Sequence, residues 1–346
     1  MSSCPIVLYG AFDRHNFGDF LLGHAAALRA APRPCLFAGL RAVDYSALGG
    51  FPVERLGDVL AGWRQRYGDA PIDLLHVGGE ILDTDSWEAA VMLLAPDEAS
   101  RVIARLDADP AGRRAWAADF LGTNTPVPYV VGKGDLPAGS RVAFRAAGGV
   151  GLARRHGDFA LAVATALGTA EAVTVRDSRT RQALADLGVA ASLEPDPATT
   201  LGPWLNREIS GVRPVVGDYV ALQCGASFGD DRNLEALAKA LGRIGLPVVA
   251  FRAGAAPWHD DLDVYRRLAG WLQMPIQIME SLHVRDIAAT IAHARLCLAS
   301  SLHALIVAGL FGVTATGLEW EEGEGAKLRA YAETWGGFQV VTADRL

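Results

Sequence analysis

A histidine and two serines at the end of an apolar run are the residues whose types and spacing best suit chemistry in this chain. Residues 296–299 predict a buried strand, and Ser300 and Ser301 can cap the helix that follows. His303 then falls in the first turn of that helix, among backbone amides that lack helical partners and favour anions. Its ordinary pKa range suits a general acid near neutral pH; the alternative is a core histidine hydrogen-bonded to backbone.

Two glycine-containing turns follow predicted strands in the first half of the chain. The first contains Asn16, Gly18 and Asp19, and the second contains Gly78 and Gly79. At the carboxyl edge of a doubly wound sheet, such turns let a ligand approach backbone amides near a helix N-terminus. The alternatives are a loop in which Asp19 is a helix N-cap, and a glycine pair that only permits a tight turn.

Two charged residues near the end of the first half could hold or orient an anionic ligand. Arg176 ends a β-branched run, and its planar guanidinium could grip a carboxylate or phosphate. Its alternative is an ion pair with Asp177 or another local acid. Asp196, between two prolines, could face a cleft as a base or orienting carboxylate, or it could be a solvated aspartate in a rigid turn.

The elements that must position these residues alternate between strand-like and helical patterns along nearly the whole chain. This rhythm predicts an α/β fold with mostly parallel sheets, and 346 residues favour two Rossmann-like domains. We place the domains at residues 1–205 and 206–346, with the boundary region near 203–216, and expect the last helix, 325–334, to lie across either domain. Strands are predicted at 5–10, 34–38, 73–78, 128–131, 142–146 and 172–176, then at 219–224, 247–252, 276–279, 296–299 and 313–316.

Composition narrows the class of partner. The chain has 39 acidic and 32 basic residues and a net charge of -7, which argues against nucleic acid as a partner. Residues 1–5 lack a basic leader pattern, and no apolar window approaches the roughly 20 residues that span a bilayer, so we expect a cytoplasmic protein without membrane insertion. The four cysteines are widely spaced and predict small buried side chains, without a metal site.

Taken in order, these segments resemble the polysaccharide pyruvyl transferase family, and the similarity covers most of the chain. The matching segments are Asn16-Phe17-Gly18-Asp19, Val77-Gly78-Gly79, Val175-Arg176-Asp177 followed by Leu187-Gly188-Val189, Asp196-Pro197-Ala198, and Leu302-His303-Ala304. Each match alone is short, and their order along the chain carries the resemblance.

The resemblance implies two Rossmann-like domains in a GT-B-like arrangement, with the active site in the cleft between them. It implies transfer of a pyruvyl group from phosphoenolpyruvate to a sugar hydroxyl, forming a ketal, without a metal or nicotinamide cofactor. The partner would be a saccharide or glycan-precursor acceptor on the side of the first domain, with the donor on the side of the second. The sequence leaves the oligomeric state open, a homo-oligomer included.

The resemblance also implies roles for single residues. His303 would be the acid that protonates the methylene carbon of the donor. The donor-binding residues would be Arg176, Ser301, Leu302, Gly78, Gly79 and Lys327. Asn16, Gly18, Asp19 and Asp196 would serve the acceptor or form the loops around it.

Ser301 departs from the pattern, because the family usually carries arginine before Leu-His. A serine cannot replace a charge-assisted bidentate contact to a trianionic donor, so either Arg252, Arg285 or Lys327 supplies the charge or the site accepts a less charged donor. Two alternatives remain open. One is a nucleotide-sugar glycosyltransferase on the same scaffold, with Glu319, Glu321 or Glu322 on the ribose. The other is a catalytically degenerate binding protein of a glycan pathway.

Overall fold

The computed structural model describes residues 4–212 and 217–346, whose contacts form two compact units. The first unit runs from Asp19 to Pro197 and includes the segment that ends at Arg14. The second comprises His15–Gly18 and the described part of Ala198–Leu346. The boundary that we expected after residue 205 falls inside helix α8 (Gly202–Glu208), and the expected boundary region includes residues 213–216, which lie outside the described residues.

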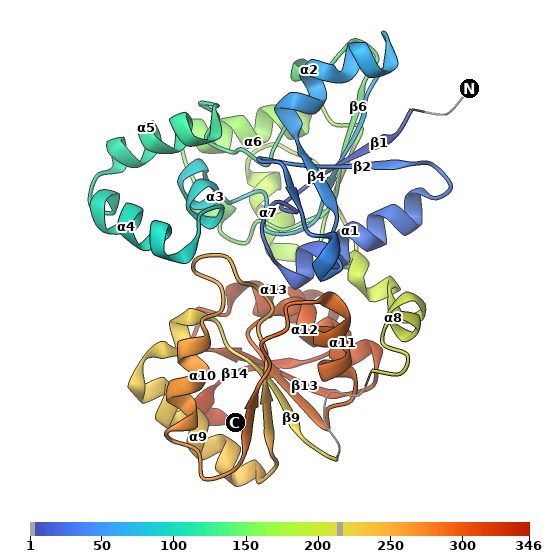
Figure 1. Cartoon of the computed structure of the whole chain (residues 1–346). Coiled ribbons are helices and arrows are strands. Elements are labelled where there is room, and N and C mark those ends of the chain that lie inside the picture. Colours follow the sequence, from blue (N-terminus) through green and yellow to red (C-terminus); the bar gives the residue numbers. More distant parts are fainter. Residues whose placement is uncertain (1–3, 213–216) are drawn as a thin grey trace. The chain divides into compact units, whose positions relative to one another are not determined.

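The first unit contains an eight-stranded sheet of order β3-β4-β2-β1-β5-β6-β7-β8 (Figure 1). Neighbouring strands are parallel except β3 and β4, which are antiparallel. The strands are β1 (Ile6–Tyr9), β2 (Cys35–Gly39), β3 (Val43–Asp44), β4 (Pro52–Arg55), β5 (Asp73–Val77), β6 (Arg141–Ala147), β7 (Ala172–Val175) and β8 (Ser192–Leu193). Central strands such as β1 are apolar on successive residues because helices cover both faces of a parallel sheet.

Several helices in this part of the chain begin at recognisable caps or prolines. They are α1 (Phe17–Ala30), α2 (Leu56–Tyr67), α3 (Ser86–Met92), α4 (Pro96–Leu106), α5 (Pro110–Leu121), α6 (Asp158–Gly168) and α7 (Ser178–Asp186). Asp85 and Glu88 form a capping box at α3, and prolines occupy the first turns of α4 and α5. Helices α3, α4 and α5 contact one another and form a group of their own (Figure 1).

One expectation for the first unit was wrong, and several elements of that unit were not predicted. The apolar run 128–131 is not a strand: Pro128 has no amide to donate, and the amide of Val131 donates to Nε2 of His76 at 3.0 Å. The stretches 40–68 and 83–126, for which no strand was predicted, contain β3, β4 and α2 in the first case and α3, α4 and α5 in the second.

The second unit contains a six-stranded parallel sheet of order β11-β10-β9-β12-β13-β14. Its strands are β9 (Val220–Gln223), β10 (Val248–Ala250), β11 (Ile276–Ile278), β12 (Leu296–Ala299), β13 (Thr314–Glu319) and β14 (Gln339–Thr342). Besides α8, its helices are α9 (Asp231–Ile244), α10 (Leu262–Ala269), α11 (Val284–Ala292), α12 (Leu302–Leu310) and α13 (Ala326–Trp335). The pair α9 and α10 and the pair α11 and α12 lie on opposite sides of the sheet (Figure 1).

Each unit has its own apolar core, as the fold class requires. Val142 and Phe144 of β6 pack with Trp63 in the first core, and Leu222 of β9 packs with Tyr265 in the second. The predicted α/β class with two Rossmann-like sheets is therefore confirmed. No helix of the described residues combines the length and apolar character needed to cross a membrane.

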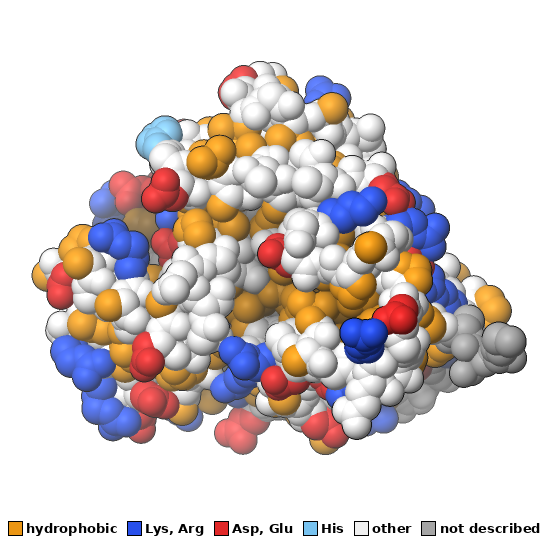
Figure 2. Space-filling model, turned by 90° about the horizontal axis from the view of Figure 1, so that it is seen from above, with side chains coloured by type: hydrophobic (Ala, Val, Ile, Leu, Met, Phe, Trp, Pro, Cys, Tyr) orange, Lys and Arg blue, Asp and Glu red, His pale blue; other side chains and the backbone are white. Residues whose placement is uncertain are grey.

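The charged surface and the four cysteines can be compared with what the sequence predicts. On the face seen in Figure 2, acidic and basic side chains are interspersed. Cys224 and Cys297 are buried, as predicted, whereas Cys4 and Cys35 are half-buried; all four are free thiols. Among the described residues, no group of three histidine, cysteine or acidic side chains is arranged to hold a metal ion.

Candidate functional site

His303 lies in the first turn of α12, directly after the end of β12. Ser301 is the N-cap, with extended backbone, and its Oγ accepts a hydrogen bond from the amide of Ala304 at 3.5 Å. The predicted cap is therefore confirmed. The imidazole of His303 is 8% exposed, and Leu302 beside it is fully buried, so the helix begins with its first side chains held in the protein interior.

The segment that carries Asn16 and Gly18 belongs to the second unit and pairs with the chain that leaves β10. Asn16 forms an antiparallel bridge with Gly254, and the amide of Phe17 donates to the carbonyl of Ala253 at 2.7 Å. The amide of Ala255 donates to the carbonyl of His15 at 3.2 Å, so residues 15–17 behave like a short strand beside the segment that leaves β10. Asn16 Oδ1 accepts from the amide of Gly18 at 2.9 Å, which turns the chain into α1.

Gly18 meets His303 at close range. A Cβ built on Gly18 would lie 2.0 Å from Nδ1 of His303 and 2.6 Å from Cγ, well inside van der Waals contact. Only glycine leaves room for the imidazole there. Two segments that the sequence predicted separately, at opposite ends of the chain, therefore meet, and the backbone of one fixes the ring position of the other.

A hydrogen-bonded network links the strand ends beside this contact. Ser300 Oγ donates to Gln223 Oε1 at 3.2 Å and accepts from the amide of Gly225 at 3.0 Å. Gln223 Nε2 in turn donates to Asp260 Oδ1 at 2.7 Å. Asp260 Oδ2 accepts from the amide of Ala253 at 2.6 Å, and so ties the segment that binds residues 15–17 to the ends of β9 and β12.

Burial shifts the pKa values of two groups in this region. Burial raises the pKa of Asp260 to about 7, against the opposing effect of the amides and of Gln223 that donate to it. Burial lowers the pKa of His15; the hydrogen bond to the carbonyl of Leu282 opposes this shift, and the positive charge of Arg252 adds to it. Gln223 and Asp260 were missed by sequence reasoning. Gln223 had a weak signal, as a polar residue at the end of an apolar strand, and Asp260 had none.

Arg252 is the candidate in this region for binding an anionic group. It follows β10 and is half-buried, and its Nε is buried without a hydrogen-bond partner among the described residues. A buried donor without a partner carries a desolvation cost that an anionic ligand would relieve. The two other cations expected here differ: Arg285 on α11 is paired with Asp286 at 3.4 Å, and Lys327 is half-buried in the first turn of α13.

Arg176 is in a different situation, inside the first unit. Its side chain is 3% exposed, it forms an ion pair with Glu80, and its Nη1 donates to Asp196 Oδ2 at 3.4 Å. Although burial acts to lower it, the charges of Glu80 and Asp196 raise the pKa of Arg176. A Cβ on Gly148 would lie 2.5 Å from Glu80 Oε1, so the backbone closes over the pair.

The structure decides between several alternatives in the first unit. Asp196 is fully buried, so the expectation of a solvated aspartate was wrong; its ion pair with Arg176 compensates the buried charge. Asp177 caps α7 by accepting from the amide of Thr180 at 2.7 Å. The role of Arg176 in donor binding stays a prediction.

The glycine turn of the first unit lies beside Asp19. Gly78 and Gly79 have φ values of 38° and 76°, the left-handed region that favours glycine. A Cβ on Gly79 would lie 3.0 Å from Asp19 Oδ1. Helix α1 begins at Phe17, so Asp19 lies within its first turn and the expectation that it is the N-cap was wrong. The side chain of Asn16 takes the capping position instead.

Comparison with solved structures shows the class of fold. UDP-GlcNAc 2-epimerase from Methanocaldococcus jannaschii, in complex with UDP-GlcNAc and UDP, aligns with a TM-score of 0.51 and 12% identity, over 99% of this chain and 89% of that chain. MurG from Acinetobacter baumannii aligns with a TM-score of 0.44 and 12% identity, over 99% and 87%. At such identity the first likeness shows the fold alone, which is of the GT-B class.

Comparison of the sequence with models of protein families identifies the family. The model of the polysaccharide pyruvyl transferase family matches residues 147–322, which is half of the chain. The chain belongs to this family, and so to a class of transferases. No curated protein sequence matches it.

Proposed function

We propose that this protein transfers a pyruvyl group from phosphoenolpyruvate to hydroxyl groups of a saccharide, forming a ketal. The observation that carries the proposal is the contact between Gly18 and His303, because it joins two family segments and gives the imidazole a fixed position at a helix N-terminus. Family membership supports the reaction class.

His303 acts as the general acid in this proposal. Its Nδ1 faces Gly18, so Nε2, on the far side of the ring, is the nitrogen that would deliver a proton. Protonation turns the methylene carbon of the donor into a methyl group and leaves an oxocarbenium-like centre at the neighbouring carbon. Sugar hydroxyls add to that centre with loss of their protons, and phosphate leaves. The step is acid catalysis and uses no metal or nicotinamide.

Arg252 takes the place of the arginine that Ser301 does not supply. Its buried Nε has no partner among the described residues, and the neighbouring Ala253 holds Phe17 of the segment that ends in Gly18. Arg252 and His303 therefore border the same short segment. A guanidinium and the amides at the start of α12 together suit an anionic donor. Lys327 and Leu302 would shape the rest of the donor site.

The acceptor would be a saccharide or glycan precursor. The alternative of a nucleotide-sugar glycosyltransferase expected Glu319 to bind the ribose. Glu319 is less suited to that role because it is bound by Arg329 and by the amides of Gly323 and Gly325. Although burial acts to raise it, these donors lower the pKa of Glu319. A cytoplasmic location remains part of this proposal.

Phosphate release and calorimetric titration test the proposal. We expect phosphoenolpyruvate to bind and UDP-GlcNAc not to bind, and we expect H303Q to lower phosphate release in the presence of saccharides by about 10²- to 10⁴-fold, the usual contribution of a general acid. H293Q is the matched control, since His293 ends α11 and bonds the carbonyl of Ala289 at 2.8 Å. Undiminished phosphate release by H303Q, or binding of UDP-GlcNAc alone, would refute the proposal.

A further inference from the structure

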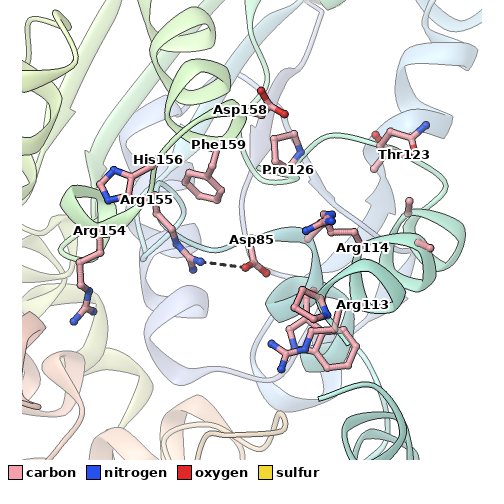
Figure 3. A pocket seen from close by; sticks show the side chains of 16 residues that line it. Asp85, Arg113, Arg114, Thr123, Pro126, Arg154, Arg155, His156, Asp158 and Phe159 are labelled. Carbon is pink, nitrogen blue, oxygen red and sulfur yellow. Dashed lines mark hydrogen bonds and ion pairs between the residues drawn. The ribbon is translucent and has the colours of Figure 1, made fainter. Parts of the chain in front are cut away.

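A cavity of about 710 Å³ lies in the first unit, away from the residues described above. Its walls come from the start of α3, from α5 and the segment that follows it, and from residues 154–159, which lead from the end of β6 into α6 (Figure 3). These are connections that leave the carboxyl ends of β5 and β6, the side of a doubly wound sheet where ligands bind. The volume suits a small molecule of one or a few rings.

The lining is basic although the chain as a whole is acidic. Four arginines and a histidine line the cavity, against two aspartates. The basic residues are Arg113, Arg114, Arg154, Arg155 and His156, and the aspartates are Asp85 and Asp158. Figure 3 shows that the arginines come from two sides, one pair from α5 and the other from residues 154–155.

One arginine on each side is held in place by the protein. The guanidinium of Arg113 lies 5.4 Å from the ring centre of Trp87, and that of Arg155 lies 5.0 Å from the ring centre of Phe159. Arg155 is also paired with Asp85 at 3.1 Å. These contacts fix both guanidinium groups and cover one face of each ring.

The other arginine on each side retains its charge for a ligand. Arg114 and Arg154 are exposed, and neither has an acidic partner within ion-pair distance in the part of the chain that the structure describes. Arg114 reaches from α5 towards the pair formed by Arg155 and Asp85 (Figure 3). Ser86, Thr123 and Asn124 also line the cavity and offer hydroxyl and amide groups. Such groups are suitable hydrogen-bond partners for sugar hydroxyls.

We infer that this cavity binds an anionic saccharide, a sugar ring that carries a carboxylate or a phosphate, with Arg114 on one side of the cavity and Arg154 on the other supplying the positive charge. The inference rests on the proposed function in taking this saccharide to be part of the acceptor. It adds a chemical class to that acceptor: a polymer or precursor that contains uronate or sugar-phosphate units.

Calorimetric titration of the full chain tests the inference with three probes. Trigalacturonate carries carboxylates, glucose 1-phosphate carries a phosphate, and maltotriose is neutral. We expect at least one charged probe to bind more than tenfold tighter than maltotriose, with an affinity that falls as salt is added. The charged probe that binds more tightly identifies which of the two anionic groups the cavity prefers.

Variants locate the binding. The double variant R114Q/R154Q should lose roughly ten- to a hundredfold in affinity for the charged probe, because two charge-assisted contacts are removed. R101Q is the control: Arg101 is an exposed arginine of α4 that does not line the cavity, and it should leave affinity unchanged. Equal loss in R101Q, an unaffected double variant, or no binding of either charged probe at millimolar concentration would overturn the inference.

The same samples separate the two proposals. If phosphoenolpyruvate binds in a way that depends on His303 but no charged saccharide binds, the cavity inference is wrong and the proposed function stands. If trigalacturonate or glucose 1-phosphate binds through Arg114 and Arg154 but phosphoenolpyruvate is neither bound nor consumed, the proposed reaction is wrong and the anionic saccharide site stands, without its assignment to the acceptor.

Discussion

In each sheet an arginine follows the carboxyl end of the strand next to an edge strand, and the two arginines differ in their partners. Arg176, after β7, is buried between Glu80 and Asp196. Arg252, after β10, is half-buried with Nε lacking a partner among the described residues. In the first unit, carboxylates at the ends of the strands therefore compensate a buried cation. In the second unit, the cation at the end of β10 lies next to the segment that contacts His303.

This difference shows that an arginine after a strand is not in itself a ligand signal. The arginine of the first unit forms ion pairs that stabilise the fold, whereas the arginine of the second unit is available to a ligand. The outcome depends on whether the neighbouring strands end in acidic residues. This difference can be tested by substituting each arginine with glutamine and measuring both the stability of the protein and its affinity for the donor.

The largest expected effect is on the folding of the first unit. R176Q removes the cation between two carboxylates and leaves Asp196 buried without its charged partner, which should cost about 3–5 kcal/mol of unfolding free energy. Urea unfolding followed by circular dichroism measures the loss. D196N is the control for the pair, and a stability of R176Q equal to wild type would show that the compensation we describe is not significant.

The next effect is on catalysis in the second unit. G18A places a methyl group within 2.0 Å of His303 Nδ1 and must displace the imidazole. A displacement of about 1 Å can lower a rate about 100-fold, so we expect a loss of that order in phosphate release from phosphoenolpyruvate. G242A is a suitable control, because a Cβ there meets nothing within 4 Å. Full activity of G18A would separate the family loop from the catalytic site.

A smaller effect is expected from removing the second arginine. R252Q should weaken phosphoenolpyruvate binding about tenfold through loss of one charge-assisted hydrogen bond, with little change in stability. Calorimetric titration measures the affinity, and R285Q serves as the control because Arg285 is paired with Asp286 at the surface of α11. If R252Q loses stability as R176Q does, or if R285Q weakens binding equally, the contrast between the two arginines fails.

The smallest effect concerns pH. Burial, with the negative charge of Glu80, raises the pKa of Asp83 to about 7. The folded state then holds this proton more tightly than the unfolded chain, so the contribution of Asp83 to stability is lost as the pH rises from about 4 to about 7.

We expect D83N to flatten the decline in stability between about pH 4 and pH 7 by on the order of 1 kcal/mol. Urea unfolding across that range measures the change, with D119N at an exposed position of α5 as the control. An unchanged pH profile in D83N would mean that burial and the charge of Glu80 do not raise the pKa of Asp83.

Local features were predictable because they depend on neighbours in the chain. The apolar runs that form β9, β10 and β12 and the serine cap of α12 follow from hydrophobic pattern and capping chemistry. The run 128–131 failed for a reason that local pattern does not contain, since its amide at Val131 serves the buried His76. The edge strand β14 was missed because it is short and only half-buried.

The sequence by itself determined the α/β class, the family and the candidate histidine, because alternation of elements and the order of short segments are visible along the chain. Only the tertiary structure decided that Gly18 meets His303, that Glu80 and Asp196 bind Arg176, and that α3, α5 and the start of α6 surround a basic cavity. These contacts join residues far apart in the chain. They depend on the order of strands in each sheet and on side-chain packing, which local periodicity does not encode.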